Sequence, residues 1–336
     1  MVVSVRDTDW DGVRLHVVTG KGGTGKTTVA AALALALASH GKPVLLMEVE
    51  GRQGIAQLFD VPPLPYEERR VAVAPADDSR PGGDLLALAV DTQSALVEYL
   101  EMFYNLRQAG RALTKLGVLD FATTIAPGLG DVLLTGKAAE AVRRKSGGSP
   151  VYGAVVLDAP PTGRISRFLN VSSEVSGLAK VGPIRNHADT VQKVIRSPQT
   201  VVHFVTLLEE MPVQETLDGI AELKEVGRGG IQPGGIIINM VRQCPELPDE
   251  EAEGQHELPA LEAGLKSAGL GEDGKLAGDL ADELADEART QRGQAGQRRL
   301  LEAAGQPCYE LPLIPDGIDL AALYRLARSL RDQGAA

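Results

Sequence analysis

The stretch Gly20-Lys-Gly-Gly-Thr-Gly-Lys-Thr-Thr28 decides the fold of this chain. It contains the phosphate-loop pattern G-x-x-x-x-G-K-[ST], formed by Gly20, Gly25, Lys26 and Thr27. Glycines let the backbone N–H groups of such a loop converge on phosphate oxygens. In this pattern the lysine reaches the β- and γ-phosphates, and the threonine hydroxyl ligates Mg²⁺. The stretch therefore predicts a site for a nucleoside triphosphate with its Mg²⁺.

The segments on either side of the loop read as a strand and a helix, in the order that the pattern requires. Residues 15–19 are short and β-branched, as a buried strand should be. Residues 29–38 read VAAALALALA and are rich in helix formers, so the loop opens a helix whose N-terminal dipole favours phosphate. The nucleotide-binding residues expected in the loop are Gly20, Gly22, Gly23, Thr24, Gly25, Lys26, Thr27 and Thr28.

The composition is that of an acidic globular protein. The 336 residues carry a net charge of −11, which argues against a nucleic-acid surface because no basic field would hold a polyanion. Cys244 and Cys308 are far apart in the sequence, which predicts a reducing compartment and no disulfide framework. The charged N-terminus has no signal-peptide core, and the apolar run from Val29 is too short to span a bilayer. We expect a cytoplasmic protein that is not integral to a membrane.

Apolar runs that read as strands recur along the chain, separated by helical stretches. Several are continuously hydrophobic, which is typical of strands buried on both faces of a parallel sheet. We expect strands at 15–19, 44–49, 85–90, 151–157, 201–207, 236–238 and 309–311. Their alternation with helices predicts a doubly wound, mostly parallel α/β fold with the ligand at the carboxyl ends of the strands. We expect one domain over residues 14–330, with flexible ends at 1–13 and 331–336.

Residues 94–121 concentrate aromatic side chains in a chain that is only 4% aromatic. One apolar helical face is formed by Leu96, Tyr99, Leu100, Phe103 and Leu106. We expect this face to pack on the sheet or on a partner subunit, and a client-binding or membrane-surface helix is the alternative. Adaptable client grooves tend to be Met-rich, and only one of the five methionines lies here. A second apolar helical segment is expected at 174–197.

Carboxylates stand at the ends of two expected strands. Asp158 ends a hydrophobic strand and precedes a rigid Pro-Pro turn, so it is placed to hold a water ligand of Mg²⁺. The N–H of Gly163, just beyond, is a candidate sensor of the γ-phosphate. Glu48 and Glu50 stand at i and i+2 of another strand and would point to one side, where a hydrolytic water is polarised. An exposed strand end is the alternative for these two.

Taken together, these motifs resemble one family. Residues 21–27 are similar to the deviant Walker A loop of the SIMIBI class of P-loop ATPases, which includes ArsA, the tail-anchored-protein targeting ATPases, MinD and ParA. Residues 158–169 resemble switch II of the ArsA and tail-anchor branch, and 208–216 resemble its P-E-x-x-x-x-x-E-T segment. Residues 237–239 and 311–315 resemble its adenine-binding strand and loop. The chain looks closest to actinobacterial ArsA-like ATPases, which are described as anion transporters and occur as paired, heterodimerising paralogues.

The resemblance implies a P-loop core with a helical insertion and a composite ATP site in a dimer. The catalytic residues that it implies are Lys21, Lys26 and Glu50. Lys21 would cross the dimer interface to the phosphates of the opposite subunit, much as an arginine finger does. Asn239 would hydrogen-bond adenine, and the loop of Pro312, Leu313 and Pro315 would pack on it. ATP would close the dimer and hydrolysis would reopen it, which would control a protein partner or a hydrophobic client.

The chain departs from the family pattern at several positions. At switch I the family has D-P-A-H-N, whereas residues 50–54 read Glu-Gly-Arg-Gln-Gly, so glutamate replaces the aspartate that positions the attacking water. At switch II the family histidine is Arg164, which would pair with phosphate or with Glu50. The CxxC that holds a shared zinc is absent, so we expect no metal besides Mg²⁺. Arsenite requires about three thiolates, and two cysteines do not supply them within one chain.

The altered switch I favours a second function, that of a nucleotide-binding regulatory subunit with weak hydrolysis, paired with an active paralogue. An arsenite or anion efflux motor is the third. Both a homodimer and a heterodimer with a paralogous ATPase are compatible with these residues.

Overall fold

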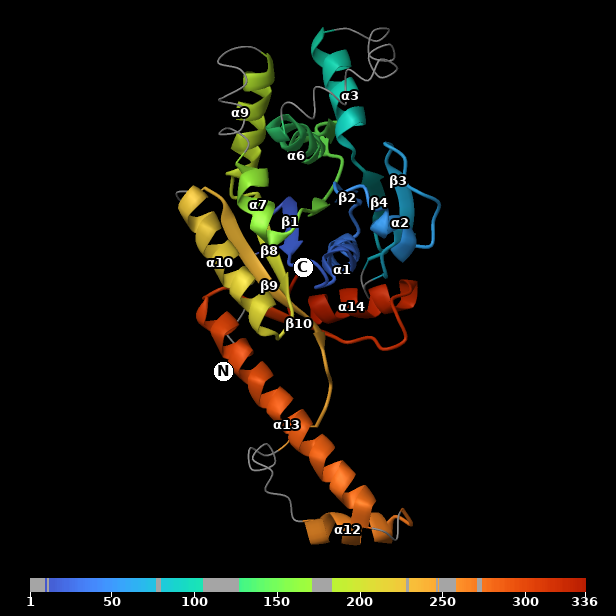
Figure 1. Cartoon of the computed structure of the whole chain (residues 1–336). Helices are drawn as coiled ribbons and strands as arrows, with labels where there is room; N and C mark the ends of the chain where they lie inside the picture. Colours follow the sequence, from blue (N-terminus) through green and yellow to red (C-terminus); the bar gives the residue numbers. More distant parts are fainter. Residues whose placement is uncertain are drawn as a thin grey trace.

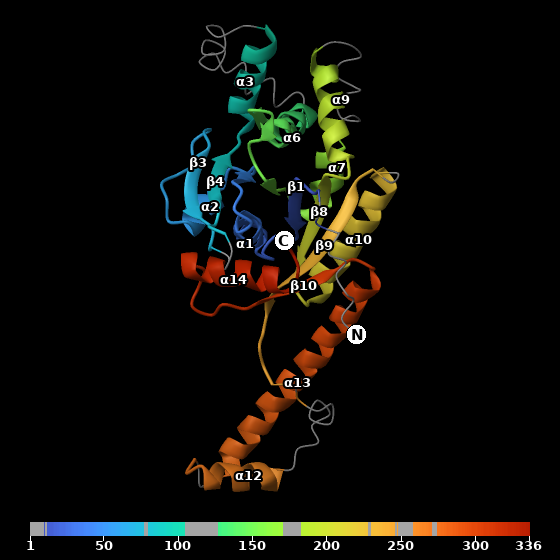
Figure 2. The same ribbon diagram turned by 180° about the vertical axis from the view of Figure 1, so that it is seen from behind.

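A computed structural model of the chain has a twisted sheet at its centre, with helices on both faces (Figure 1). The structure describes residues 10, 12–76, 80–104, 127–170, 183–227, 230–245, 247, 258–270 and 274–336. Seen from behind, the same layers flank the sheet (Figure 2).

The described residues form one eight-stranded sheet with the order β10-β9-β8-β1-β7-β2-β4-β3. In chain order its strands are β1 (Leu15–Gly20), β2 (Val44–Glu48), β3 (Arg69–Val73), β4 (Asp84–Ala89), β7 (Ala154–Asp158), β8 (Thr200–Thr206), β9 (Gln232–Val241) and β10 (Cys308–Pro312). Neighbouring strands in it are parallel, except that β3 runs antiparallel to β4. The short β5 (Lys145–Ser146) and β6 (Ser149–Pro150) pair separately as a hairpin.

The predicted doubly wound, mostly parallel α/β fold is confirmed. Each expected strand is present, and every residue of β1, β2, β7 and β8 is buried, as their continuous hydrophobicity indicates. Sequence reasoning missed the two-residue strands β5 and β6 of the hairpin, and within the eight-stranded sheet it missed β3. Strand β3 lies at the sheet edge, and its first two residues, Arg69 and Arg70, are exposed, so it lacks the apolar pattern of a buried strand.

The helices divide between the two faces of the sheet. One face carries α1 (Lys26–Ala38), α2 (Gly54–Leu58) and α14 (Leu320–Asp332). The other carries α3 (Thr92–Tyr104), α6 (Pro127–Arg143), α7 (Thr162–Leu169), α9 (Pro183–Ile195) and α10 (Glu210–Gly227). Nine of the 13 residues of α1 are buried, and all nine are alanine, leucine or valine. A helix buried to this extent needs no polar face.

The predicted helical segments at 94–121 and 174–197 are represented by α3 and α9, while residues 105–121 and 174–182 lie outside the described part of the chain. Leu96 and Tyr99 of the expected apolar face are buried in the core together with residues of α6. For these two residues, packing within the molecule is therefore confirmed. Figure 1 shows α3, α6 and α9 grouped at one end of the molecule.

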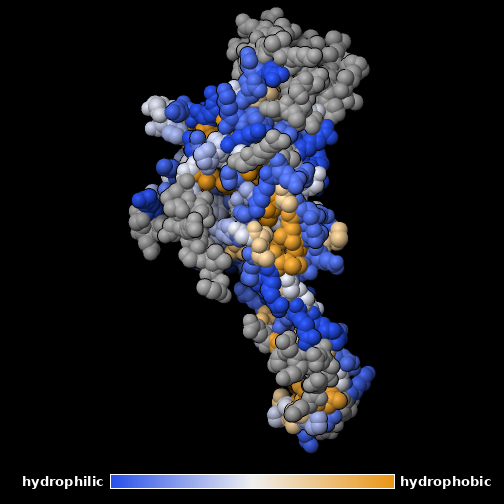
Figure 3. Space-filling model, turned by 90° about the vertical axis from the view of Figure 1, so that its left-hand side faces the viewer, coloured by the Kyte–Doolittle hydropathy of each residue, from blue (hydrophilic) through white to orange (hydrophobic). Residues whose placement is uncertain are grey.

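At the opposite end, α12 (Leu258–Ser267) and α13 (Gly274–Ala303) form an arm that projects from the body (Figures 1 and 2). Its surface is largely hydrophilic, with hydrophobic patches toward its far end (Figure 3). The exposed large apolar residues there are Leu258, Leu270 and Leu276. Among the described helices, none combines the length and apolar character that a membrane crossing requires.

Both ends of the described chain contact the body. The Trp10 ring stacks on His203, and its Nε1–H donates to the Tyr309 hydroxyl at 3.0 Å. At the other end, Ala335 is buried and its N–H donates to the Leu330 carbonyl at 2.9 Å. Residues 1–9 and 11 lie outside the described part of the chain.

Candidate nucleotide site

The glycine-rich loop joins β1 to α1 at the carboxyl end of the central strand. β1 lies between β7 and β8, and the chain passes through α1 to reach β2 on the far side of β7. In open α/β sheets a ligand binds at the carboxyl ends of the strands, where the order of the strands reverses direction. The predicted loop thus occupies the position that this architecture reserves for a ligand.

Contacts from distant segments fix the shape of the loop. The Thr24 hydroxyl donates to the Lys21 carbonyl at 2.8 Å, which closes a turn inside the loop. The Asn239 amide, at the end of β9, donates to the Thr24 carbonyl at 2.9 Å. Gly25 caps α1 in the left-handed conformation, with φ of 82°, and a Cβ at this position would lie 2.4 Å from Asn239 Nδ2. Only glycine satisfies both the dihedral angle and the contact.

Gly25→Ala should therefore weaken the loop by both mechanisms. We expect the free energy of unfolding to fall by about 1–3 kcal/mol, because a non-glycine residue at this φ is strained and must also displace Asn239. Urea denaturation followed by circular dichroism measures this loss. Gly278→Ala in α13 is the matched control, since a Cβ there meets no atom within 4 Å. An equal response of the two variants would contradict the structural role of Gly25.

Asp158 and Thr27 meet where β7 ends beside the start of α1. The Thr27 hydroxyl donates to Asp158 Oδ2 at 2.7 Å, while the buried Oδ1 has no hydrogen-bond partner among the described residues. Burial raises the pKa of Asp158 to about 6, opposed by the Thr27 hydrogen bond and by the charge of Lys26. The carboxylates of Glu48 and Glu50 raise this pKa further. A buried carboxylate oxygen without a partner, beside a threonine hydroxyl, suits Mg²⁺ held through a water ligand, whereas the described residues bring no three acidic, histidine or cysteine side chains together around a metal position.

The carboxylates of Glu48 and Glu50 have different surroundings. Glu48 is the last residue of β2 and is buried, and it accepts the N–H groups of Gly54 and Ile55 at 3.2 and 3.3 Å. It thus holds the N-terminus of α2. Because β2 ends at Glu48, strand alternation does not extend to Glu50. Glu50 instead lies 3.8 Å from the exposed Arg52 and does not share the anchoring role of Glu48.

Residues from the two stretches that resemble switch I and switch II line one cavity of about 340 Å³, which we call the switch cavity. Its lining residues are Val49, Glu50, Arg52, Thr92, Gly130, Asp131, Leu134, Pro160 and Arg164. Among the described ion pairs, Glu50 pairs with Arg52 and not with Arg164. Asp131, from α6, adds a carboxylate that sequence reasoning missed, because α6 carries no motif and is far from both switches in the chain.

Gly163 lies in the first turn of α7, whose N–H groups have no partner within the helix. A Cβ at this position would meet no atom within 4 Å, so the space in front of the backbone is open. This placement is compatible with the predicted role of the Gly163 N–H as a γ-phosphate sensor, which stays a prediction.

Two of the four residues predicted for adenine line a separate cavity of about 560 Å³. Asn239 and Leu313 line it, whereas Pro312 and Pro315 flank Leu313 in the chain without lining it. The Leu313 N–H donates to the Val241 carbonyl and so ties this loop to β9. The opposite wall comes from α13, through Thr290, Gly293, Gln294 and Gln297. Sequence reasoning missed these residues because a polar stretch of this kind is typical of a solvated helix.

The two loop lysines differ in their partners. Lys21 Nζ forms an ion pair at 2.5 Å with Glu215 of α10 in the same chain, and both side chains are partly exposed. Lys26 forms no ion pair among the described residues. Lys26 is therefore available to phosphate within its own loop, whereas Lys21 must leave Glu215 to contact anything else.

Comparisons with known proteins agree on one family. The family model described as anion-transporting ATPase matches residues 13–198. The ATPase BagA of Mycobacterium tuberculosis is 51% identical over 96% of this chain and 94% of its own length. The arsenical pump-driving ATPases of Acidiphilium multivorum and Escherichia coli are 27% and 26% identical, over 70% and 74% of this chain and 40% and 44% of their own lengths.

Proposed function

This chain belongs to the anion-transporting ATPase family and is an ATPase, and from that premise we propose that it is a dimeric, Mg²⁺-dependent switch whose nucleotide cycle controls a protein partner. The observation that carries the proposal is the Thr27–Asp158 hydrogen bond beside Lys26, with Glu50 and Arg164 around the adjoining cavity. One site thus brings together a phosphate-binding lysine, a metal-binding pair and both switches.

Each residue has a role that follows from its position. Lys26 would bind the β- and γ-phosphates, and Thr27 and Asp158 would hold Mg²⁺, Asp158 through a water molecule. When bound, Mg²⁺ supplies charge neutralisation at the phosphates. Glu50 orients and polarises the attacking water from the switch cavity. The Gly163 N–H senses the γ-phosphate, and Arg164 is near enough to the same cavity to contact phosphate oxygens.

The dimer in this proposal depends on Lys21. Glu215 holds Lys21 within its own chain, and an exposed ion pair of this kind contributes only about 0–1 kcal/mol. The multiple charges of a nucleoside triphosphate on an opposing subunit would therefore outcompete Glu215. Closure of the dimer around ATP would transfer Lys21 from Glu215 to the phosphates, and hydrolysis would return it.

Lys21→Ala tests this role. We expect ATP turnover to fall about a hundredfold or more, as for a missing trans-acting cation, while ATP affinity changes less than about threefold because Lys26 and Thr27 remain. Phosphate release and binding of a fluorescent ATP analogue measure the two effects. Lys224→Ala, an exposed lysine on α10, is the matched control. Unchanged turnover in Lys21→Ala would exclude a catalytic role for Lys21.

A regulatory subunit with weak hydrolysis is the second candidate function. It is favoured by Glu50, which replaces the aspartate of the family pattern and whose carboxylate lies 3.8 Å from the guanidinium of Arg52 as an ion-pair partner. Phosphate release by the chain alone, and after addition of a paralogue, distinguishes the two proposals. Robust turnover by the chain alone would contradict the regulatory function.

The cysteines give no support to a metalloid-driven motor. Cys308 begins β10 opposite Ile236, while Cys244 lies beyond Val241 at the other end of β9, so the two thiols lie toward opposite ends of the strand pair. Burial raises the pKa of Cys308 to about 11, and Glu302 and Glu310 add to the rise. This thiol stays protonated at neutral pH, whereas a metalloid requires thiolates close together.

A further inference from the structure

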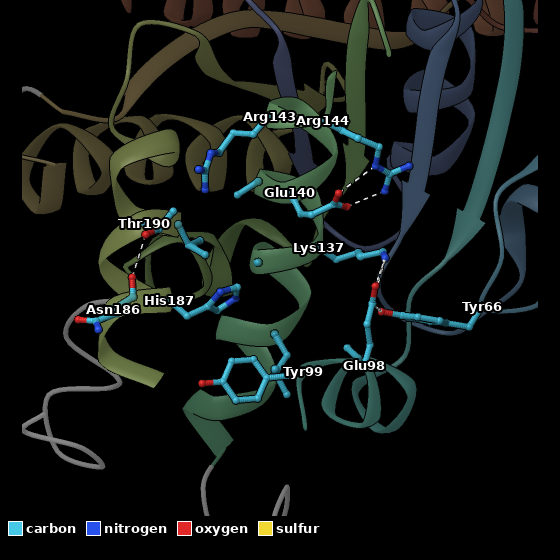
Figure 4. Close-up of a pocket in the computed structure, with 15 residues that line it drawn as sticks. Tyr66, Glu98, Tyr99, Lys137, Glu140, Arg143, Arg144, Asn186, His187 and Thr190 are labelled. Atoms are coloured by element: carbon cyan, nitrogen blue, oxygen red, sulfur yellow. Dashed lines mark hydrogen bonds and ion pairs between the residues drawn. The ribbon is translucent and has the colours of Figure 1, made fainter. Parts of the chain in front are cut away.

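A cavity of about 430 Å³ lies between α3, α6 and α9, outside the nucleotide site (Figure 4). A volume of this size is within the range of pockets that bind small molecules. α6 lines both this cavity and the switch cavity, but with different residues: Leu133, Gly136 and Lys137 here, and Gly130, Asp131 and Leu134 there. We call the first one the α3–α6–α9 cavity.

Part of the lining of the α3–α6–α9 cavity belongs to the hydrophobic core. Five of its lining residues are buried members of the hydrophobic core, namely Ala95, Tyr99, Leu133, Ala139 and Val191. The His187 ring packs against Gly136 so closely that a Cβ there would lie 2.4 Å from His187 Nε2. It also meets the Tyr99 ring edge-on, with centroids 5.4 Å apart. The apolar part of the cavity surface is therefore formed by closely packed side chains of the core.

Most charges around this cavity neutralise one another. Lys137 pairs with Glu98 at 2.7 Å. Arg144 lies between Glu140 and Glu68, at 2.6 and 2.7 Å. These carboxylates therefore have their own cations, and the paired groups attract no further charge.

Arg143 is the exception. Its side chain is exposed, and among the described residues it forms no ion pair. Figure 4 shows it extending from α6 toward α9, on the side of the cavity where Asn186 and Thr190 lie. The neighbouring His187 does not compete for an anion, because burial and the charge of Arg143 lower its pKa and keep the ring neutral at pH 7. The rim thus offers one cation above an apolar floor.

We propose that the α3–α6–α9 cavity binds a small amphiphilic monocarboxylate. The acid group pairs with Arg143, and the hydrocarbon body lies against Leu133 and Val191. A single guanidinium that has no ion-pair partner among the described residues suits a single negative charge, and the other cations of the lining, Lys137 and Arg144, are already paired and do not provide for a second charge. This inference does not depend on the nucleotide cycle proposed above.

Isothermal titration calorimetry of the full chain without nucleotide, with octanoate as the probe, tests the proposal. We expect saturable binding of octanoate at one site and binding at least about tenfold weaker for octan-1-ol, which has the same chain length and no charge. Arg143→Gln should weaken octanoate about tenfold and leave octan-1-ol unchanged. The exposed Arg185 of α9 does not line the cavity, so Arg185→Gln is the matched control.

Val191→Phe gives an independent test, because it fills the cavity without changing charge. We expect it to abolish octanoate binding, with its fold verified by circular dichroism; Arg143→Gln carries the test if this variant does not fold. Absence of saturable octanoate binding, or equal binding by Arg143→Gln and the unaltered chain, would overturn the proposal.

Discussion

Lys26→Ala will lower ATP turnover at least about a hundredfold, the effect expected when one preorganised cation is removed from a phosphoryl-transfer site. Lys26 begins α1 directly after the glycine turn, and among the described residues it has no competing carboxylate partner. Its charge already lowers the pKa of Asp158, so its ammonium group acts on the same space as the metal-binding pair. Unlike Lys21→Ala, this variant should also lose ATP affinity, because Lys26 contacts phosphate in the ground state as well.

Phosphate release and binding of a fluorescent ATP analogue, measured on the same preparations, separate the two effects. The exposed Lys266 of α12 provides the matched control, and Lys266→Ala should behave as the unaltered chain. Turnover by Lys26→Ala at the level of this control would mean that the loop does not hold the reacting nucleotide.

Acidification from pH 7.5 to 5.0 will destabilise the fold by several kcal/mol through two buried histidines. His16 of β1 and His203 of β8 lie on adjacent strands, with Nδ1 of His16 3.1 Å from Nε2 of His203. The Gly235 N–H donates to His203 Nδ1 at 3.1 Å, so the proton of His203 is on Nε2 and is donated to His16. The Trp10 ring stacks on both imidazoles, and each histidine is only 1% exposed, so a charge on either ring would be poorly solvated.

The sign of the effect follows from the pKa shifts. Burial lowers the pKa of His16 to about 3, and burial together with His16 lowers that of His203 well below its usual value. At a pH between the folded and unfolded pKa values, the histidines bind protons in the unfolded chain but not in the folded chain. Their full contribution to the free energy of unfolding is therefore present above about pH 6.5 and is lost as the pH falls. At pH 5.0 each histidine lowers the free energy of unfolding by about 2 kcal/mol.

Asp158 acts in the opposite direction. Its pKa is about 6 in the folded chain, above the ordinary value for aspartate, so its contribution to stability is lost as the pH rises. When the pH falls from 7.5 to 5.0, Asp158 adds about 1.4 kcal/mol to the free energy of unfolding, which is less than the two histidines remove. The net change on acidification is therefore a loss of stability.

Urea denaturation at the two pH values, followed by circular dichroism, measures this loss. In His203→Gln the amide can still accept from Gly235 and donate to His16, and it does not titrate. The acid-induced loss should therefore fall by about 2 kcal/mol relative to the unaltered chain. The exposed His40 supplies the control, since His40→Gln should leave the loss unchanged. If His203→Gln loses as much stability as the unaltered chain, the buried pair is not the cause.

Local patterns allowed most of the fold to be predicted from the sequence. The hydrophobic runs of the buried strands and the loop around Gly25 each contain their own signal, so their positions are confirmed to within a few residues. Asp158 could be placed beside the loop because parallel strands end at the same edge. Strand β3 lacked such a signal, because its exposed arginines hide its pairing with β4.

The remainder of the site depends on contacts between distant segments. Lys21 and Glu215 are 194 residues apart, and no local pattern pairs them. The same holds for the walls that α13 contributes to the Asn239 cavity and that Asp131 contributes to the switch cavity. The different roles of Glu48 and Glu50 could not be predicted for another reason. β2 ends at Glu48, so strand alternation does not continue to Glu50. As a result Glu48 anchors α2, whereas Glu50 faces the switch cavity.

Mixing two inactive variants tests the proposed composite site most directly. A Lys21→Ala subunit keeps its own Lys26, and a Lys26→Ala subunit can donate its Lys21, so a mixed dimer contains one complete site. Phosphate release is measured for each variant alone and for an equimolar mixture. If Lys21 acts across the interface, the mixture recovers about a quarter of the unaltered activity, because half of the dimers are mixed and each has one of two sites. A mixture no more active than the separate variants would contradict a composite site in a dimer of this chain.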